Sequence, residues 1–130
     1  MKRVVIESPF AGNIEMNKAY GRFAMHDCLV NHNESPYASH LLYTQENVLR
    51  DHLPEERKLG IEAGFFWRNV AEKSIFYTDL GVTEGMKLGI KDCEKKKKDY
   101  ELRILPKDLW ISFSNFCFTK GLGNPLERKE

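Results

Sequence analysis

The feature that most constrains the fold is the regular alternation of short apolar runs with longer segments of helical periodicity. The apolar runs are residues 3–8, 35–45, 74–81 and 100–105. The segments with helical spacing are residues 13–32, 53–74 and 83–98. Strands that alternate with helices pair in parallel and are covered by helices on both faces. The sequence therefore predicts a single compact α/β domain, with a mainly parallel sheet of four to five strands flanked by helices.

Two of the helical segments carry an apolar face and a start signal. In the first, apolar residues recur mostly every three or four positions, and Asn13 or Asn17 is available as the cap. These residues are Ile14, Ala19, Phe23, Ala24, Cys28 and Leu29. The second opens with Pro54 and two glutamates, which favour a first helical turn. Its predicted apolar stripe is Leu59, Ala63, Phe66 and Val70.

The C-terminal segment has an aromatic centre and a polar end. Residues 109–118 read LWISFSNFCF and contain one tryptophan and three phenylalanines, Trp110, Phe113, Phe116 and Phe118. Exposing these rings together would create an apolar patch of the kind found at interfaces. We therefore expect a domain over residues 1–105. Residues 106–130 form an extension, with an added strand or helix that packs on the domain or on a second subunit, and with a mobile end.

Composition narrows the class of protein. A formal net charge of +1 over 130 residues gives no general reason to bind nucleic acid or an anionic membrane. The basic run Lys95–Lys98 suits the C-terminal end of a helix, with a local phosphate or nucleic-acid contact as the alternative. Cys28, Cys93 and Cys117 have neither disulfide nor metal-ligand spacing. With no signal peptide and no apolar stretch near the roughly 18 residues of a membrane span, we expect a cytoplasmic protein without metal or cofactor.

The candidate site lies where the strands end. Ligands of open parallel sheets bind beyond the carboxyl ends of the strands, so the loops after the first three strands should converge on one cleft. A glycine-rich turn, GVTEGM, enters the third helix there and can present backbone N–H groups to an anion, although its glycines can equally serve only a sharp turn. These loops offer Ser8, Phe10, Ser39, His40, Tyr43, Asp79, Thr83 and the N–H groups around Gly85.

Each of these residues has a structural alternative. Asp79 can cap the turn that follows its strand, and His40 can be a hydrogen-bonded structural histidine. Ser8 and Ser39 have no base at a recognisable sequence spacing, so we expect phosphate or ribose contacts rather than a Ser/His/Asp hydrolase. Trp67 follows two phenylalanines, which favours packing over base stacking.

Three stretches resemble the nucleoside 2-deoxyribosyltransferase superfamily, especially its small branch from phage and bacterial genomes. They are VVIESPFAGN, SHLLYTQ and YTDLGVTEGMKLGI, in that order, and the resemblance covers roughly residues 3–105. It implies a flavodoxin- or Rossmann-like sheet, homo-oligomers, and a cleft for a nucleoside or nucleotide. Members of the superfamily break or exchange the N-glycosidic bond with a glutamate nucleophile.

The resemblance also implies roles for single residues. Lys87 stands in GMKLG where the transferases have the glutamate of GMELG, Asp79 resembles an upstream aspartate, and Glu62 a carboxylate of the preceding helix. Phe10 falls near an aromatic residue under the base or sugar. A lysine cannot form a glycosyl ester but attracts phosphate. The ligand contacts expected are Ser8, Phe10, Ser39, His40, Tyr43, Glu62, Asp79, Thr83, Gly85, Met86 and Lys87.

Three hypotheses follow for function. The first is a nucleotide-binding protein without turnover, for example a phage protein that sequesters a cyclic or ADP-ribose-type signalling nucleotide of the host's defence. The second is an active N-glycosidase or 2-deoxyribosyltransferase that uses another carboxylate, with Glu84, Glu62 and Asp79 as candidates. The third is an interaction protein that acts through the aromatic segment 109–118.

Overall fold

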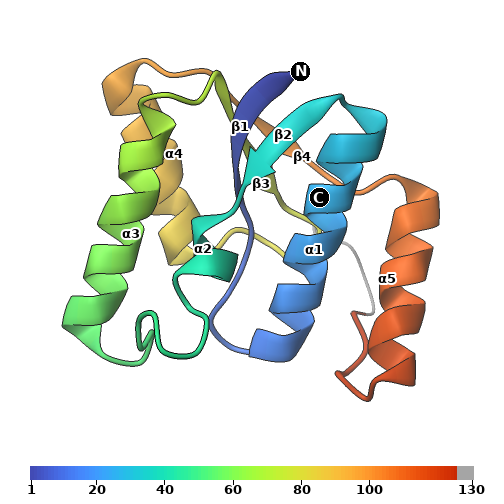
Figure 1. Ribbon diagram of the computed structural model, residues 1–130. Coiled ribbons are helices and arrows are strands. Elements are labelled where there is room, and N and C mark those ends of the chain that lie inside the picture. The colour runs from blue at the N-terminus through green and yellow to red at the C-terminus, as the bar shows by residue number, and fades with distance from the viewer. Residues whose placement is uncertain (126–130) are drawn as a thin grey trace.

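A four-stranded parallel sheet forms the middle layer of the chain (Figure 1). The computed structural model describes residues 1–125. The strands are β1 (Lys2–Glu7), β2 (Glu34–Tyr37), β3 (Lys73–Tyr77) and β4 (Tyr100–Arg103). Their order across the sheet is β2-β1-β3-β4, and every neighbouring pair is parallel. The predicted α/β class with a parallel sheet is confirmed.

Helices cover both faces of this sheet. They are α1 (Ile14–Asn31), α2 (Ser39–Leu42), α3 (Pro54–Arg68), α4 (Glu84–Lys96) and α5 (Lys107–Thr119). Figure 1 shows α3 and α4 together on one side of the sheet, and α1 and α5 on the other. Among the described residues, no helix combines the length and the apolar character needed to cross a membrane.

Polar caps set the starts of α1 and α4. The Asn13 side chain accepts a hydrogen bond from the Met16 N–H at 3.3 Å, which selects one of the two predicted caps. Thr83 serves α4 in the same way. The basic run closes α4: Lys97 adopts a left-handed conformation, and the cations of this last turn favour the negative end of the helix dipole.

The larger core lies between the sheet and the α1/α5 pair. Phe113 of α5 is fully buried, and its ring centroid is 5.4 Å from that of Tyr20 on α1. The aromatic C-terminal segment is therefore a helix that packs on the domain. Phe118 does not join it, because 84% of its surface is exposed. The predicted mobile end falls partly on residues 126–130, which lie outside the described residues.

The segment behind the second predicted strand is not simply a loop. Residues 35–45 were expected to hold a strand followed by a polar loop, but β2 ends at Tyr37 and the chain then forms the short helix α2. β2 is an edge strand and contains Pro36, a residue that sheets tolerate at an edge. The turn into α2 brings Leu41 against α1, where a Cβ added to Gly21 would lie only 3.1 Å from it.

The predicted apolar stripe of α3 is wrong. Leu59, Phe66 and Val70 are more than half exposed, whereas Gly64 and Arg68 are buried against the sheet. This helix approaches its neighbours through a glycine and a charged network, so helical spacing of apolar residues did not indicate its inner face. On α1 the same prediction fails for Ile14 and Leu29, which are also exposed.

Candidate functional site

A cavity of about 300 Å³ opens at the carboxyl ends of β1 and β3. The helices that follow these two strands, α1 and α4, lie on opposite faces of the sheet (Figure 1). This is the switch point at which open parallel sheets bind ligands. The cavity lies on the α3/α4 side, where its walls come from the loop after β1, from α2 and the segment behind it, from α3 and from the start of α4.

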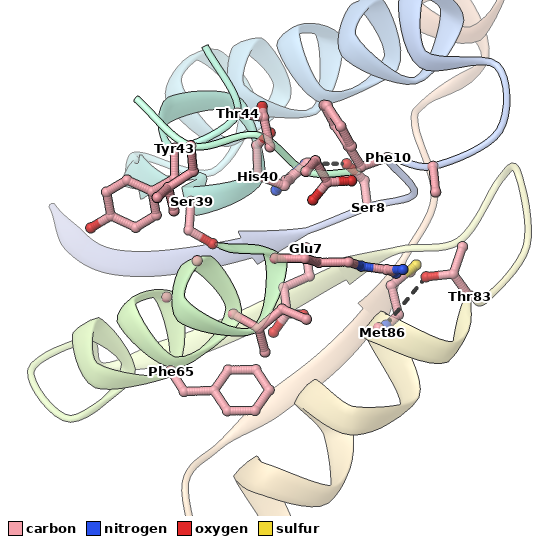
Figure 2. A pocket seen from close by; sticks show the side chains of 18 of the residues that line it. Glu7, Ser8, Phe10, Ser39, His40, Tyr43, Thr44, Phe65, Thr83 and Met86 are labelled. Atoms are coloured by element: carbon pink, nitrogen blue, oxygen red, sulfur yellow. Dashed lines mark hydrogen bonds between the residues drawn. The ribbon is translucent and has the colours of Figure 1, made fainter. Parts of the chain in front are cut away.

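Glu7, the last residue of β1, supplies a carboxylate inside this cavity (Figure 2). Arg68 of α3 is only 1% exposed and donates to Glu7 Oε2 through a short charged hydrogen bond. The same guanidinium donates to Asp92 Oδ2 of α4 at 2.7 Å and to the Ser74 hydroxyl of β3 at 2.9 Å. Two helices and two strands therefore fix the position of one carboxyl group.

Burial raises the pKa of Glu7 to about 7. Arg68 favours the ionised form and lowers this value, whereas the negative charge of Asp92 raises it. Desolvation is the largest effect, because it penalises a charge that is removed from water. At neutral pH the Glu7 carboxyl is accordingly close to half-protonated.

Two glycines let the helices approach this network. A Cβ added to Gly89 of α4 would lie 2.7 Å from the carboxyl carbon of Glu7. A Cβ added to Gly64 of α3 would lie 3.0 Å from the Cβ of Ser39. Real Cβ atoms do not approach other heavy atoms this closely, so the carboxyl of Glu7 and the start of α2 occupy space that only glycine leaves open.

Ser8 and His40 form a second polar pair at the cavity. Ser8 Oγ lies 2.7 Å from His40 Nε2, at hydrogen-bonding distance. Burial lowers the pKa of His40 to about 4, so the imidazole is neutral at pH 7. No sequence spacing marks this pair, since His40 follows Ser8 by 32 positions, but the convergence of the two loops brings them together.

Aromatic and apolar groups line the rest of the cavity. Phe10 and Phe65 line it from the β1 loop and from α3, and Figure 2 shows them on opposite sides of the open space. The Tyr43 ring also lines the wall, but its hydroxyl is bonded to the Tyr37 hydroxyl and to Trp67 Nε1. Tyr43 therefore braces α2 against α3, and Trp67 packs as expected, with its ring 5.1 Å from that of Tyr37.

The start of α4 closes one end of the cavity. Thr83, Glu84, Gly85 and Met86 all line it. The Thr83 hydroxyl accepts from the Met86 N–H at 3.3 Å and so caps the helix. The first N–H groups of a helix have no acceptor within the helix, and those of Glu84 and Gly85 belong to this turn.

A wider, more open groove of about 910 Å³ adjoins the cavity. Phe10 and Phe65 line both spaces, so the two are continuous. Basic side chains outnumber acidic ones along the groove. The basic residues are Lys18, Arg50, Arg57 and Lys58, and the acidic residues are Asp51 and Glu62.

Most of the predicted contacts meet at the cavity. They are Ser8, Phe10, Ser39, His40, Tyr43, Thr83, Gly85 and Met86. Asp79 does not line it. Its carboxylate is fully buried on the α1 side, where Oδ2 accepts from the Tyr20 hydroxyl at 2.6 Å and from the Leu105 N–H at 2.9 Å. The structural alternative for Asp79 was a cap of the turn that follows its strand, whereas these contacts join it to α1 and to the backbone 26 positions later.

Three other charged candidates have largely exposed side chains. Lys87 does not line it and is paired with Glu84 at 3.2 Å on the exposed side of α4. Glu84 reaches the rim, but its side chain is 86% exposed. Glu62 is an exposed residue that lines only the outer groove.

Sequence reasoning missed Glu7, Arg68 and Phe65. Glu7 had a usable signal, since a carboxylate ends an apolar strand at the edge where ligands bind. The signal for Arg68 was weaker. Arg68 follows Gly64 by four positions, so the two residues share one face of the helix, but nothing local in the sequence shows that this face is buried.

The comparisons with known proteins give a family but no activity. A family model described as Domain of unknown function (DUF7768) matches residues 2–103. The chain belongs to this family. The DUF7768 match ends with β4 and so leaves α5 outside it. The chain has no significant match to a curated protein or to a solved structure.

Proposed function

We propose that this DUF7768 chain binds a nucleoside or nucleotide in the cavity between the carboxyl end of β1, α2, α3 and the start of α4. One observation carries the proposal: aromatic rings, hydroxyl groups and a helix start converge at the switch point of a parallel sheet. The resemblance of three sequence stretches to nucleoside 2-deoxyribosyltransferases supports this ligand class. Each stretch contributes residues that line the cavity.

The shape of the site suggests how such a ligand would lie. Phe10 and Phe65 offer aromatic faces to a base, and the Ser39 hydroxyl is available to a sugar. The Thr44 hydroxyl donates to the His40 carbonyl at 2.6 Å and can still accept a hydrogen bond. A volume of about 300 Å³ is at the small end of ligand pockets. It favours a single nucleoside unit in the inner cavity over a dinucleotide.

Phosphate groups would face outward. The N–H groups at the start of α4 attract anions, and Arg57 and Lys58 stand along the outer groove. An ADP-ribose-type ligand would place its second half in this groove. The sequence predicted a phosphate contact from Lys87. In the structure Lys87 is paired with Glu84 on the exposed side of α4, so it is less well placed than these groups to contact a bound phosphate.

Sequestration without turnover rested on the lysine at position 87. The structure adds Glu7 as a carboxyl inside the cavity, so the absence of a glutamate at 87 no longer argues against chemistry. A cytoplasmic protein remains part of the proposal, supported by three free, buried cysteines. Self-association also remains part of the proposal, supported by the exposed apolar side chains of Leu59 and Phe66 on α3 and of Val70 just after it.

The test is to identify what the protein holds. Purified protein is incubated with a panel of nucleosides, mononucleotides, cyclic nucleotides and ADP-ribose, washed, denatured by heat, and the released compounds are separated by chromatography. Phe65→Ala should reduce recovery at least tenfold. Phe66→Ala is the matched control, because Phe66 is the next residue of α3 but is 73% exposed. Recovery of neither an intact compound nor its free base, or equal loss in both variants, would contradict the proposal.

A further inference from the structure

Glu7 is the carboxyl group that the fold holds most firmly inside the cavity. Arg68 holds Oε2, and Arg68 is itself fixed by Asp92 and Ser74. Three other carboxylates line the cavity. Glu56 accepts three hydrogen bonds from Arg50, the exposed Glu84 is paired with Lys87, and Asp51 stands where the cavity meets the outer groove.

The close fit around Glu7 has no evident use in packing. Burying an ion pair between two helices and a sheet is weak for stability, since desolvation offsets the attraction between the charges. The space that Gly89 leaves open is filled by a carboxyl group rather than by an apolar side chain. A buried carboxyl that is held by a guanidinium and lines a cavity is the arrangement expected of a proton-transfer group.

We propose that Glu7 is the acid–base residue of this cavity, and that a bound nucleoside or nucleotide is hydrolysed there at its N-glycosidic bond. The choice of substrate rests on the proposed function, whereas the choice of residue rests on the position of Glu7. Glu7 is none of the three carboxylates that the sequence offered for chemistry, Glu84, Glu62 and Asp79.

The step uses one water molecule. The ionised Glu7 carboxylate takes a proton from the water as its oxygen bonds to the anomeric carbon of the sugar. The bond from that carbon to the base breaks, and its electron pair stays on the base nitrogen. The proton then passes from Glu7 to that nitrogen, so free base and free sugar leave and Glu7 returns to its starting state.

The groups that face Glu7 suit this exchange. They are Arg68 of α3, Asp92 and Cys93 of α4, and Ser74 of β3. Burial and Asp92 raise the pKa of Glu7 to about 7 while Arg68 opposes them, and a general base is most effective when its pKa lies near the working pH. Lys96 pairs with Asp92 at 3.2 Å and moderates its charge.

The main test compares wild type with Glu7→Gln, which keeps the shape and hydrogen bonds of a protonated glutamate. Free base released from the nucleotide panel should fall at least about 100-fold. Recovery of intact ligand from denatured Glu7→Gln should be at least as high as from wild type, because wild type converts part of its ligand to free base. Glu94→Gln is the matched control, because Glu94 lies on the exposed side of α4, where its Oε2 accepts from the Tyr100 hydroxyl at 3.3 Å. It should release base at the wild-type rate.

The outcomes separate this inference from the proposed function. If wild type retains intact ligand but releases no base beyond one equivalent, the role of Glu7 is refuted and nucleotide binding stands. If Glu7→Gln cleaves as fast as wild type, the residue assignment is wrong. If no compound is bound or cleaved, the proposed function fails, and the inference fails with it.

A pH profile covers the case in which Glu7→Gln does not fold. The wild-type rate should rise with pH to a plateau, with a midpoint near 7, as Glu7 ionises. Asp92→Asn removes a neighbouring negative charge and should move this midpoint to lower pH. A rate that is flat between pH 5.5 and 8.5, or a midpoint unmoved in Asp92→Asn, would overturn the proposal.

Discussion

The two faces of the sheet differ in what they bury. The α1/α5 face holds one large cluster of thirteen buried residues, almost all apolar, which includes Ile6, Ile75 and Phe113. The α3/α4 face holds a cluster of only three, Phe76, Met86 and Cys93, beside the charged network and the cavity. Most of the apolar burial that stabilises the fold therefore lies on one side, and the candidate site lies on the other.

Strand alternation produces this division. Along β1, Val4 and Ile6 enter the large cluster, whereas Val5 and Glu7 line the cavity on the opposite face. The same strand thus contributes apolar side chains to the large core on one face and cavity-lining side chains on the other. A substitution on one face should change stability, and one on the other should change ligand chemistry.

The largest test of this comparison is a pair of phenylalanines. Phe113→Ala removes a fully buried ring that contacts Tyr20, Phe23 and Trp110, and should lower the free energy of unfolding by about 3–5 kcal/mol. Phe65→Ala removes a partly exposed ring at the cavity and should cost about 1 kcal/mol. Urea unfolding measures both, and equal losses would contradict the division between the faces.

The sheet could be predicted because its evidence is local. Each strand is a compact apolar run, and the segments between them are long enough for crossover helices. The general place of the site followed from the same step, since the carboxyl ends of parallel strands share one edge. Residues such as Ser8 and His40 could therefore be expected to meet at that edge.

The charged centre could not be predicted in the same way. Arg68 is buried because its guanidinium reaches from α3 to Glu7 of β1 and Asp92 of α4, and the contact with Glu7 joins residues 61 positions apart in the sequence. Lys87 illustrates the opposite case. Met86, Gly89 and Cys93 form the buried face of α4, so helical geometry alone places residue 87 outside it.

The pH dependence of the free energy of unfolding should report the shifted pKa values of Glu7 and His40, two residues that line the cavity. As pH rises from 4.5 to 7, the unfolded chain releases the Glu7 proton while the folded protein keeps it, which favours unfolding. As pH falls from 6.5 to 4, the unfolded chain protonates His40 while the folded protein leaves it neutral, which also favours unfolding. Between 4.5 and 6.5 the two slopes oppose each other and largely cancel.

Because the contributions of Glu7 and His40 largely cancel in wild type, variants of each residue should reveal how the other makes the free energy of unfolding depend on pH. In Glu7→Gln the free energy of unfolding, relative to wild type, should gain about 1.4 kcal/mol per pH unit between 4.5 and 7, or about 3 kcal/mol in all. In His40→Gln it should lose a similar amount per unit as pH rises between 4 and 6.5. Urea unfolding at a series of pH values gives both differences. Parallel curves for all three proteins would mean that neither group is shifted.

Asp79 tests the other face. Asp79→Asn removes the charge from a buried acceptor of hydrogen bonds from Tyr20 and Leu105, and should cost about 1–3 kcal/mol of stability. Ligand recovery should stay at the wild-type level under conditions where the variant is folded, because Asp79 does not line the cavity. Tyr20→Phe is the partner control and should destabilise without affecting binding. Loss of binding in folded Asp79→Asn would return this residue to the site.

The smallest effect, and the sharpest in sign, is expected from two glycines of α4. Alanine usually stabilises a helix by about 1 kcal/mol over glycine. Gly85→Ala should show part of this gain, because its Cβ would have no neighbour nearer than 3.9 Å. Gly89→Ala should instead lose about 1 kcal/mol, because its Cβ would overlap the carboxyl of Glu7 and the cost of overpacking exceeds the gain. Thermal unfolding distinguishes the two signs. If Gly89→Ala is as stable as Gly85→Ala, Glu7 moves aside easily, and the firm placement of its carboxyl is refuted.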